Sequence, residues 1–343
     1  MRYIFALLMA FTLFSCSDNK NTDNSSKDST NSVSSELVVP PLADSFYMNY
    51  KFKTGDKFSY KIKTISSSSQ ELQSDSTMKT NVNQTVEYTI NLSVVNIDTN
   101  KLANINVFIE SIVLDGIING QPILYDSKYI QSSQERIMFA QYESIKNKSF
   151  SIDITENGEI VKIYNTDSIV NELILAQNQQ NKVTNEQKIV LQNNFIQSSL
   201  KPLSEQIFKK FPSEKVLINY NWTEKYYSQF ALFQIENIAS FQIVDIISDQ
   251  NDSLIVLSAG LTINWVGDHN ASEQGMTFYF YDPIVSGTGI IRFNKFRGLV
   301  INSNTTTKME MTTDINGFDE NKFPFKAKRI DNTSNTNIVT LVN

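Results

Sequence analysis

The sequence of 343 residues contains a single cysteine, Cys16, and a single histidine, His269. One cysteine excludes a disulfide within the chain, and these two residues cannot build a Cys/His metal cluster, a nucleophilic Cys/His pair or a two-histidine metalloprotease site. His269 follows Gly267 and Asp268 in a sequence typical of a turn between strands, so we interpret it as an exposed loop residue. We therefore predict no catalytic residue, no bound metal and no cofactor.

Long hydrophobic runs and positive charge are also scarce. Outside residues 3–14, no segment approaches the roughly 20 apolar residues that a transmembrane helix requires. The chain has 30 Lys and Arg residues against 36 Asp and Glu residues, which gives a formal net charge of -6. Because a mildly acidic protein has no general attraction for nucleic acid, we expect no nucleic-acid partner.

The cysteine lies directly after the apolar run. Arg2, the run 3–14 and the small residue Ser15 predict a secretory signal peptide over residues 1–15. The ending Leu13-Phe14-Ser15-Cys16 resembles a bacterial lipobox, whose cysteine is diacylated and becomes the new amino terminus. We therefore predict lipidation at Cys16 and attachment to a membrane through that lipid. The alternatives are an ordinary cleaved signal with an incidental cysteine, or a short buried helix.

The segment that follows is almost free of apolar side chains. Residues 17–35 are mostly Ser, Asn, Asp, Thr and Lys, a composition that cannot offset the entropy of ordering by burial. We predict a disordered tether over residues 16–45, including the lipidated cysteine. Asp18 and Asp23 resemble the acidic signals that send Bacteroidota lipoproteins to the outer face of the outer membrane. We expect an outer membrane lipoprotein, with the cell surface favoured and the periplasmic face as the alternative.

Alternation of apolar and polar residues dominates the remaining chain. Most even positions over residues 78–94, including Val82, Val86 and Ile90, are apolar, while most odd positions are polar. This period of two predicts a long strand with one buried face. Similar runs occur at 58–62, 105–113, 150–154, 233–247, 254–263, 276–280, 289–293 and 306–311. Asn157-Gly158 and Arg297-Gly298 predict hairpins between neighbouring runs.

The middle of the chain has helical signals instead. Thr166 or Asp167 can cap one helix, and Thr184 with Gln187 has the spacing of a capping box before a second helix. We expect Pro202 to kink or divide the second helix and Pro212 to end it. The apolar residues of this segment fall on roughly one broad face, which could pack on the sheet, line a ligand pocket or lie on a membrane. The candidate ligand-binding residues on this face are Ile189, Phe195, Leu203 and Phe211.

These patterns predict an α+β, β-rich fold. We expect long curved antiparallel sheets in two similar halves, with central helices packed on the sheet. The two halves are suggested by a repeated order of an aromatic strand, long alternating strands and a late hairpin. The expected units are an N-terminal β half at 46–165, central helices at 166–212, a C-terminal β half at 213–330, and a tail at 331–343 that could add a last strand.

Acidic and aromatic clusters are the remaining candidates for chemistry. We interpret the stretch 314–320 as a solvated turn, because it lacks the alternating ligands and distal glutamate of a calcium loop. Asp and Glu residues distant in sequence could still converge on a glycosidase-like site. Tyr279 and Tyr281 alternate with Phe278 and Phe280, so we expect the tyrosines to face solvent or a ligand.

Several short motifs follow one another in a recognisable order. They are Gly55-Asp56 before an aromatic strand, Tyr125-Asp126-Ser127, Asn157-Gly158, a central helix, the segment 212–222, and Gly287-Thr288-Gly289 before Ile-Ile-Arg-Phe. Over roughly residues 46–320 this order resembles an uncharacterised lipoprotein domain family of Bacteroidota. The family is similar in outline to the LolA and LppX group, in which a curved antiparallel sheet wraps helices and an apolar concavity can accept acyl chains.

The resemblance and the composition together suggest a function. We expect a noncatalytic lipoprotein of the bacterial cell envelope that binds a lipid or other hydrophobic ligand in a groove between sheet and helices. The first alternative is a surface-exposed structural or interaction lipoprotein with a filled core and a protein partner. The second alternative is a carboxylate-based hydrolase that acts on glycans.

Overall fold

The computed structural model describes residues 45–180, 182–230, 233–249, 252–273, 275–318 and 323–342. Cys16, the predicted signal peptide and residues 16–44 of the predicted tether lie outside the described residues.

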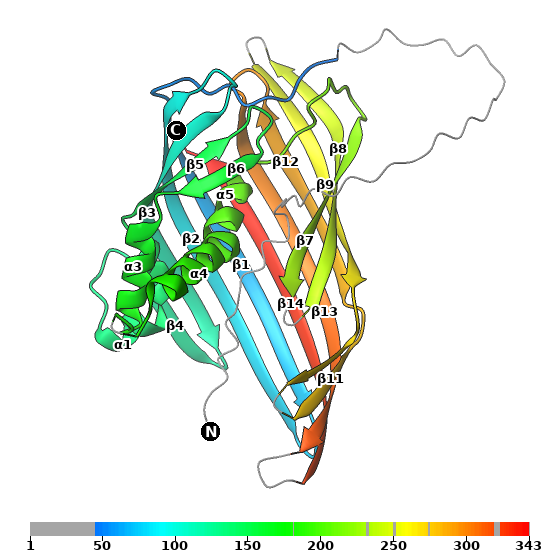
Figure 1. Cartoon of the computed structure of the whole chain (residues 1–343). Helices are drawn as coiled ribbons and strands as arrows, with labels where there is room; N and C mark the ends of the chain where they lie inside the picture. Colours follow the sequence, from blue (N-terminus) through cyan, green and yellow to red (C-terminus); the bar gives the residue numbers. More distant parts are fainter. Residues whose placement is uncertain are drawn as a thin grey trace, which may run out of the picture.

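The described chain forms one antiparallel sheet of 14 strands (Figure 1). Its strands are β1 (Lys57–Gln73), β2 (Thr77–Ile97), β3 (Ala103–Ile118), β4 (Gln121–Asp126), β5 (Ser149–Ile154), β6 (Ile160–Tyr164), β7 (Asn221–Phe230), β8 (Phe233–Asp249), β9 (Asp252–Val266), β10 (Asn270–Glu273), β11 (Met276–Phe280), β12 (Ile284–Asn294), β13 (Leu299–Phe318) and β14 (Pro324–Leu341). The main order is β6-β5-β3-β2-β1-β14-β13-β12-β9-β8-β7, while β4 pairs with β3, and β11 pairs with β10 and β13. The predicted β-rich fold with a long antiparallel sheet is confirmed.

The first and last strands meet at the centre of this sheet. β1 pairs with β14 from Tyr60 opposite Leu341 to Gln73 opposite Lys328. β2 to β6 lie on one side of this central pair, and β7 to β13 lie on the other. The two halves therefore share one continuous set of backbone hydrogen bonds. Residues 331–341, predicted as a tail that could add a last strand, belong to this central strand β14.

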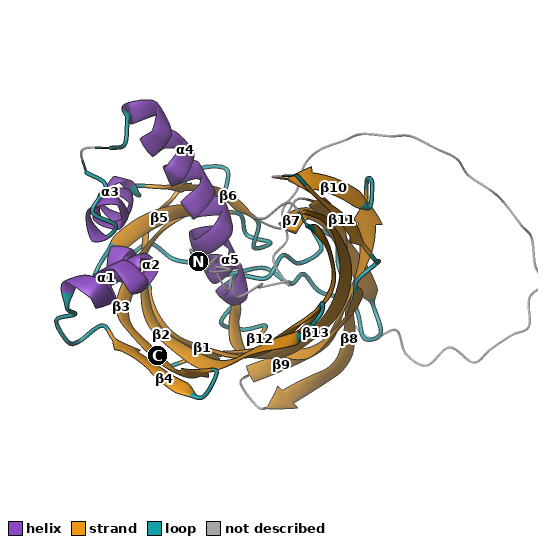
Figure 2. Ribbon diagram, turned by 90° about the horizontal axis from the view of Figure 1, so that it is seen from below, coloured by secondary structure: helices purple, strands orange, loops and turns teal. Residues whose placement is uncertain are grey.

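The alternation in β2 shows why the sheet forms. Val82, Val86, Ile90 and Leu92 are buried, and most of the residues between them are exposed or half-buried. The register shifts opposite Thr89 and Ile90, where Glu110 of the partner strand β3 is the extra residue of a bulge, which bends β3 and increases its twist. Seen from below, the whole sheet curls into a deep trough with its apolar face inside (Figure 2). Both predicted hairpins are present, between β5 and β6 and between β12 and β13.

Helices occupy the mouth of the trough and its β3–β6 side. They are α1 (Ser133–Met138), α2 (Ala140–Ile145), α3 (Asp167–Ala176), α4 (Asn185–Phe195), the π-helical turn η1 (Ile196–Leu200) and α5 (Lys201–Ile207). α1 and α2 were not predicted from the sequence. The predicted capping box of α4 is present, with Thr184 Oγ1 accepting from Gln187 N at 3.3 Å and Thr184 N donating to Gln187 Oε1 at 2.9 Å. α5 lies inside the curve of the sheet (Figure 2).

The second helical segment ends earlier than expected. Pro202 lies in the first turn of α5, directly after the π-helical turn, so the predicted division of the helix is confirmed. The prediction that Pro212 ends the helix is wrong, because Phe208 is already extended after Ile207. This early ending turns Phe208 and Phe211 into the core, where they are 2% and 1% exposed. Burial of two aromatic side chains outweighs one further turn of helix.

Candidate functional site

Helix α5 separates two cavities inside the trough. The first, here called the sheet–helix cavity, lies between the inner face of β1 and β2 and the residues of α2, η1 and α5, with a volume of about 110 Å³. The second, here called the lysine cavity, lies between α5, the β5–β6 turn, β6 and β8, with a volume of about 220 Å³. The first matches the place where the sequence predicted a groove between sheet and helices.

The sheet–helix cavity has a mixed lining of apolar, aromatic and polar side chains, and its polar members include Thr64, Gln84 and Gln141. Val86 and Tyr88 come from β2, Ile145 from α2, and Phe195 and Leu203 from the helical segment after the predicted cap. Val86 and Tyr88 are on the inner face of β2 because of its period of two, so the alternation already marked them. No carboxylate, imidazole or ammonium group is among the described residues that line this cavity.

Two tyrosines in the lining are held in the neutral form. Tyr88 and Tyr142 lie edge to face with ring centroids 6.4 Å apart. Burial raises the pKa of Tyr142 to about 12. Burial also raises the pKa of Tyr88 well above its ordinary value, and the nearby Tyr142 adds to this effect. Both phenols are therefore uncharged at neutral pH and contribute apolar surface with a polar tip.

Polar atoms without partners lie in and beside this cavity. Gln206 of α5 lines it, is 7% exposed, and has no hydrogen-bond partner for its Oε1 among the described residues. Ser66 Oγ and Asn335 Oδ1, on residues 3% and 4% exposed, also lack a partner there. Ser66 is opposite Asn335 in the sheet and opposite the cavity residue Gln84 on its other side. A buried polar atom without a partner costs about 1–3 kcal/mol, so each marks a place where a water or ligand atom would be stabilising.

A belt of short polar side chains continues from this edge across the inner face of the central strands. Its buried members are Thr64, Ser66, Ser303, Thr305, Thr307, Asn335 and Asn337. Thr64 Oγ1 donates to Asn337 Oδ1 at 2.9 Å across the β1–β14 pair. The inner wall therefore changes from apolar to polar at the sheet–helix cavity.

The structure brings together two of the four predicted ligand-binding residues. Phe195 and Leu203 line the sheet–helix cavity. Ile189 does not, because its side of α4 faces solvent and the residue is 58% exposed. Phe211 packs instead against Tyr50 and Phe293, with ring centroids 5.6 and 4.8 Å away. The sequence did not indicate Gln206, although it follows Leu203 by three residues, because the residues that surround and bury it come from other parts of the chain.

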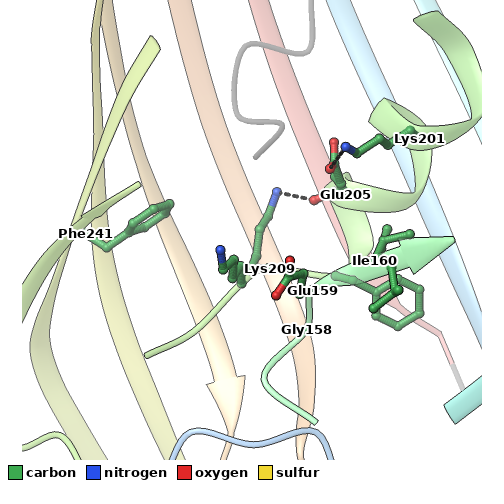
Figure 3. A pocket seen from close by; sticks show the side chains of 10 residues that line it. Gly158, Glu159, Ile160, Lys201, Glu205, Lys209 and Phe241 are labelled. Carbon is green, nitrogen blue, oxygen red and sulfur yellow. Dashed lines mark hydrogen bonds and ion pairs between the residues drawn. The ribbon is translucent and has the colours of Figure 1, made fainter. Parts of the chain in front are cut away.

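The lysine cavity is charged and was not predicted. Lys201, Lys209 and Lys210 line it together with Glu159 and Glu205, and Phe241 of β8 lies on the opposite side (Figure 3). Lys201 Nζ is 3.8 Å from Glu205 Oε1, and Lys209 Nζ donates to the backbone carbonyl of Glu205 at 2.8 Å. Burial raises the pKa of Glu205 to about 8, while Lys201 and Lys209 act to lower it. Glu205 is therefore mostly protonated at neutral pH.

The other candidate groups are spread over the surface. His269 lies in the predicted turn between β9 and β10, where its Nε2 is 2.8 Å from Asp282 Oδ1 and its ring stacks on Trp265. The residues 314–318 belong to β13, so the prediction of a solvated turn there is wrong for this part of the stretch. Tyr279 and Tyr281 are 40% and 42% exposed, as expected. Within the described ranges, no group of three or more His, Cys, Asp and Glu residues is placed to hold a metal ion.

Membrane-spanning helices were searched over the same ranges. None of the helices in the described part of the chain combines the length and the apolar character needed to cross a membrane.

Comparison with known proteins finds one family. Residues 100–300, more than half of the chain, match the model of a family described as a "Family of unknown function (DUF6263)". No curated protein matches the sequence.

Comparison with solved structures finds distant likenesses. A structure described as lipid–protein interactions in lipovitellin is 10% identical over 85% of this chain and 26% of the other, with a TM-score of 0.41. The chain thus spans about a quarter of the length of that lipovitellin chain. Pseudomonas aeruginosa OpdQ is 8% identical over 83% of this chain and 99% of the other, with a TM-score of 0.20. Pseudomonas aeruginosa OccK5 (OpdH) is 4% identical over 83% and 99%, with a TM-score of 0.21. No function follows from likenesses of this kind.

Proposed function

The chain belongs to the DUF6263 family, a family of unknown function, and on this premise we propose that it is a noncatalytic binding protein of the bacterial cell envelope. Its ligand is an amphipathic, lipid-like molecule held in the sheet–helix cavity. The protein is attached to the outer membrane through a lipid on Cys16. The single observation that carries the proposal is a partly apolar cavity whose wall includes the buried amide oxygen of Gln206, which has no partner among the described residues.

The apolar part of the lining supports a hydrophobic segment of the ligand. Tyr88, Phe195 and Leu203 present aromatic and aliphatic surface from both the sheet and the helices. Pockets that enclose a whole drug-sized ligand measure about 300–1,000 Å³. A cavity of about 110 Å³ therefore suits one section of a ligand, such as part of an acyl chain or one ring.

The polar atoms make an amphipathic ligand a better fit than a pure hydrocarbon. Gln206 Oε1 can only accept a hydrogen bond, so the ligand needs a donor such as a hydroxyl or amide N–H near it. Ser66 and Asn335 supply further polar atoms along the same inner face. A hydrocarbon in this position would leave the amide oxygen buried and unpaired, which costs about 1–3 kcal/mol.

Attachment at Cys16 rests on the sequence. The lipobox-like ending and the polar segment after it support a lipid anchor followed by a spacer. The order of short motifs that resembles a Bacteroidota lipoprotein family favours the same placement in the envelope. Exposure on the cell surface remains our first choice over the periplasmic face.

Ligand binding is tested first by recovering what the protein carries. The full chain with Cys16→Ser is purified without detergent, extracted with organic solvent and analysed by mass spectrometry. We expect repeated recovery of one class of amphipathic lipid. Repeated extracts without any lipid would favour the alternative of an interaction protein with a filled core.

A matched pair of variants tests the location of the site. Ser199 lines the cavity and is half-buried, whereas Asn194 is an exposed residue of the preceding helix α4 that does not line it. Ser199→Trp fills the cavity, so we expect it to weaken binding of the hydrophobic probe 1-N-phenylnaphthylamine by about tenfold, or about 1.4 kcal/mol. Asn194→Trp keeps the wild-type affinity. Equal affinity of the two variants, each shown to be folded by circular dichroism, would place the ligand elsewhere or exclude it.

A further inference from the structure

The polar groups that line the sheet–helix cavity are all uncharged in the part of the chain that the structure describes. They are the hydroxyl and amide side chains of Thr64, Gln84, Gln141, Ser198, Ser199 and Gln206 and the phenols of Tyr88 and Tyr142. An ionised group inside this cavity would have no opposite charge in the described lining, and a buried charge without compensation is costly. The lining therefore favours a ligand section that forms hydrogen bonds but carries no charge.

Charged residues that are close to the lining residues in the sequence do not line this cavity. Lys201 and Glu205 are four positions apart, so they share one face of α5, and both line the lysine cavity. Gln206 directly follows Glu205 but lines the sheet–helix cavity. The carboxylate of Glu143 in α2 accepts a hydrogen bond from the Tyr125 hydroxyl at 2.8 Å. The uncharged lining thus follows from the way the helices are placed, although charged residues are near in sequence.

Gln206 presents a hydrogen-bond acceptor that the fold leaves unused. The residue is 7% exposed, and its Oε1 has no partner in the described segments of the chain. It lines the cavity from the helix side, whereas Thr64 and Tyr88 line it from the sheet side. An amide oxygen accepts hydrogen bonds and cannot donate them. A ligand hydroxyl or N–H would supply the missing bond, whereas an ether oxygen would leave the buried acceptor unpaired.

We propose that Gln206 is a specificity-determining residue, and that it selects uncharged amphiphiles with a hydroxyl or amide N–H donor, such as a long-chain alcohol or a fatty acid amide. This inference rests on the proposed function, because it names the ligand class of the same cavity. A carboxylate or phosphate at the position of Gln206 would be a buried charge without compensation. An ether or a hydrocarbon there would lack the donor that the amide oxygen requires.

Three probes of similar length test this selection on the Cys16→Ser protein at pH 8. The alcohol 1-dodecanol carries the donor, its isomer 1-methoxyundecane lacks the donor, and dodecanoate is ionised. Their affinities are measured by displacement of 1-N-phenylnaphthylamine. We expect 1-dodecanol to bind about tenfold more tightly than either of the other probes, because it alone pairs the buried oxygen without bringing a charge.

A matched pair of variants then assigns the selection to Gln206. Gln206→Met replaces the amide by an apolar side chain of similar length, so we expect the alcohol and the ether to bind within about twofold of each other. Gln197 is exposed on η1 and does not line the cavity, so Gln197→Met keeps the preference of about tenfold. Circular dichroism shows that each variant is folded.

The possible results separate this inference from the proposed function. Equal binding of the alcohol and the ether by the Cys16→Ser protein, or tighter binding of dodecanoate, would overturn the selection but leave a binding cavity. A preference that persists in Gln206→Met, or is lost in Gln197→Met, would overturn the role of Gln206. Binding of none of the three probes would overturn the proposed function as well. The comparison of the probes on the Cys16→Ser protein decides the selection even if Gln206→Met does not fold.

Discussion

Tyr50 and Lys209 are 159 residues apart in the sequence and are joined by their hydrogen bonds. The Tyr50 hydroxyl accepts from the backbone N–H of Lys209 at 2.7 Å and donates to the Lys209 carbonyl at 3.2 Å. Tyr50 is 4% exposed, and burial raises the pKa of its hydroxyl well above the ordinary value, although the Lys209 backbone acts to lower it. This contact fixes the chain directly after α5, and with it the lysine that enters the charged cavity.

We expect Tyr50→Phe to lower the free energy of unfolding by about 1–3 kcal/mol, because the Lys209 N–H and C=O lose their partner in a buried position. Urea unfolding followed by circular dichroism measures the change. Tyr47→Phe is the matched control, since Tyr47 is 52% exposed and the substitution keeps the ring over which Lys215 lies. A similar loss in both variants would show that the hydrogen bonds contribute little.

Gly158 has no room for a side chain. Its φ is +93°, and a Cβ at this position would lie 2.2 Å from the Lys209 carbonyl oxygen and 2.6 Å from Tyr50 Cε2. We expect Gly158→Ala to lower the free energy of unfolding by at least about 3 kcal/mol, from backbone strain and overpacking together.

A substitution at Gly55 distinguishes backbone strain from overpacking. Its φ is +92°, and a Cβ added there would meet nothing within 4 Å beyond its chain neighbours. Gly55→Ala therefore carries the backbone strain alone, about 1–2 kcal/mol. Thermal unfolding of the two variants measures the difference. Equal losses would mean that the chain around Lys209 moves to accept the methyl group.

Glu205 makes stability depend on pH. Its pKa is raised in the folded protein to about 8 by burial, from about 4.5 when exposed, so the folded state binds more protons than the unfolded state between these values. The free energy of unfolding therefore falls as pH rises through this window, by at most about 1.4 kcal/mol per pH unit from this group. Glu205→Gln removes this loss. We therefore expect the free energy of unfolding of the variant to increase relative to that of the wild type from about pH 5 to 8, and the difference to stay constant above pH 8.

Glu186→Gln is the control for this pH dependence. Glu186 is exposed in the first turn of α4, and hydrogen bonds from its own backbone N–H and from Thr184 lower its pKa. The sign of its contribution is therefore opposite to that of Glu205. Urea unfolding from pH 4 to pH 9 measures both variants, and a constant difference between Glu205→Gln and the wild type would contradict the raised pKa.

Cys16→Ser tests the anchor. If diacylation attaches the protein to the membrane, the variant moves from the membrane fraction to the soluble fraction, because one or more long acyl chains supply the binding energy. Fractionation and immunoblotting of cells that express either form measure the shift. A variant that stays with the membrane in the same amount would show that the cysteine is not the attachment point.

The sequence predicts which residues form strands better than it predicts which strands pair with one another. Alternation in β2 identifies its buried face, because the period of two is a local property of each strand. The pairing of β1 with β14 joins residues more than 250 positions apart, such as Tyr60 and Leu341, and no local pattern encodes that choice. α1 and α2 were missed because each is only six residues long, too short to show a helical period.

The residues of the candidate sites also divide into those that a local sequence pattern predicts and those that it does not. Phe195 and Leu203 were predicted correctly as lining residues because they lie on an apolar helical face. Ile189 follows the same apolar pattern, but its side of α4 faces solvent. The lysine cavity was missed because Lys201 and Lys209 resemble ordinary surface residues in the sequence. In the fold Lys209 is buried and Lys201 half-buried, because both line a cavity shared with Phe241 and the β5–β6 turn.

By itself the sequence determined the β-rich class, the two hairpins and the capping box of α4, because each depends on residues close together in the chain. Only the tertiary structure decided that two halves form one sheet, that α5 separates two cavities, and that Gln206 and Glu205 are buried. The physical reason is that burial and partner choice depend on segments distant in the sequence. Solvation, hydrogen bonding and pKa follow from those segments once the chain has folded.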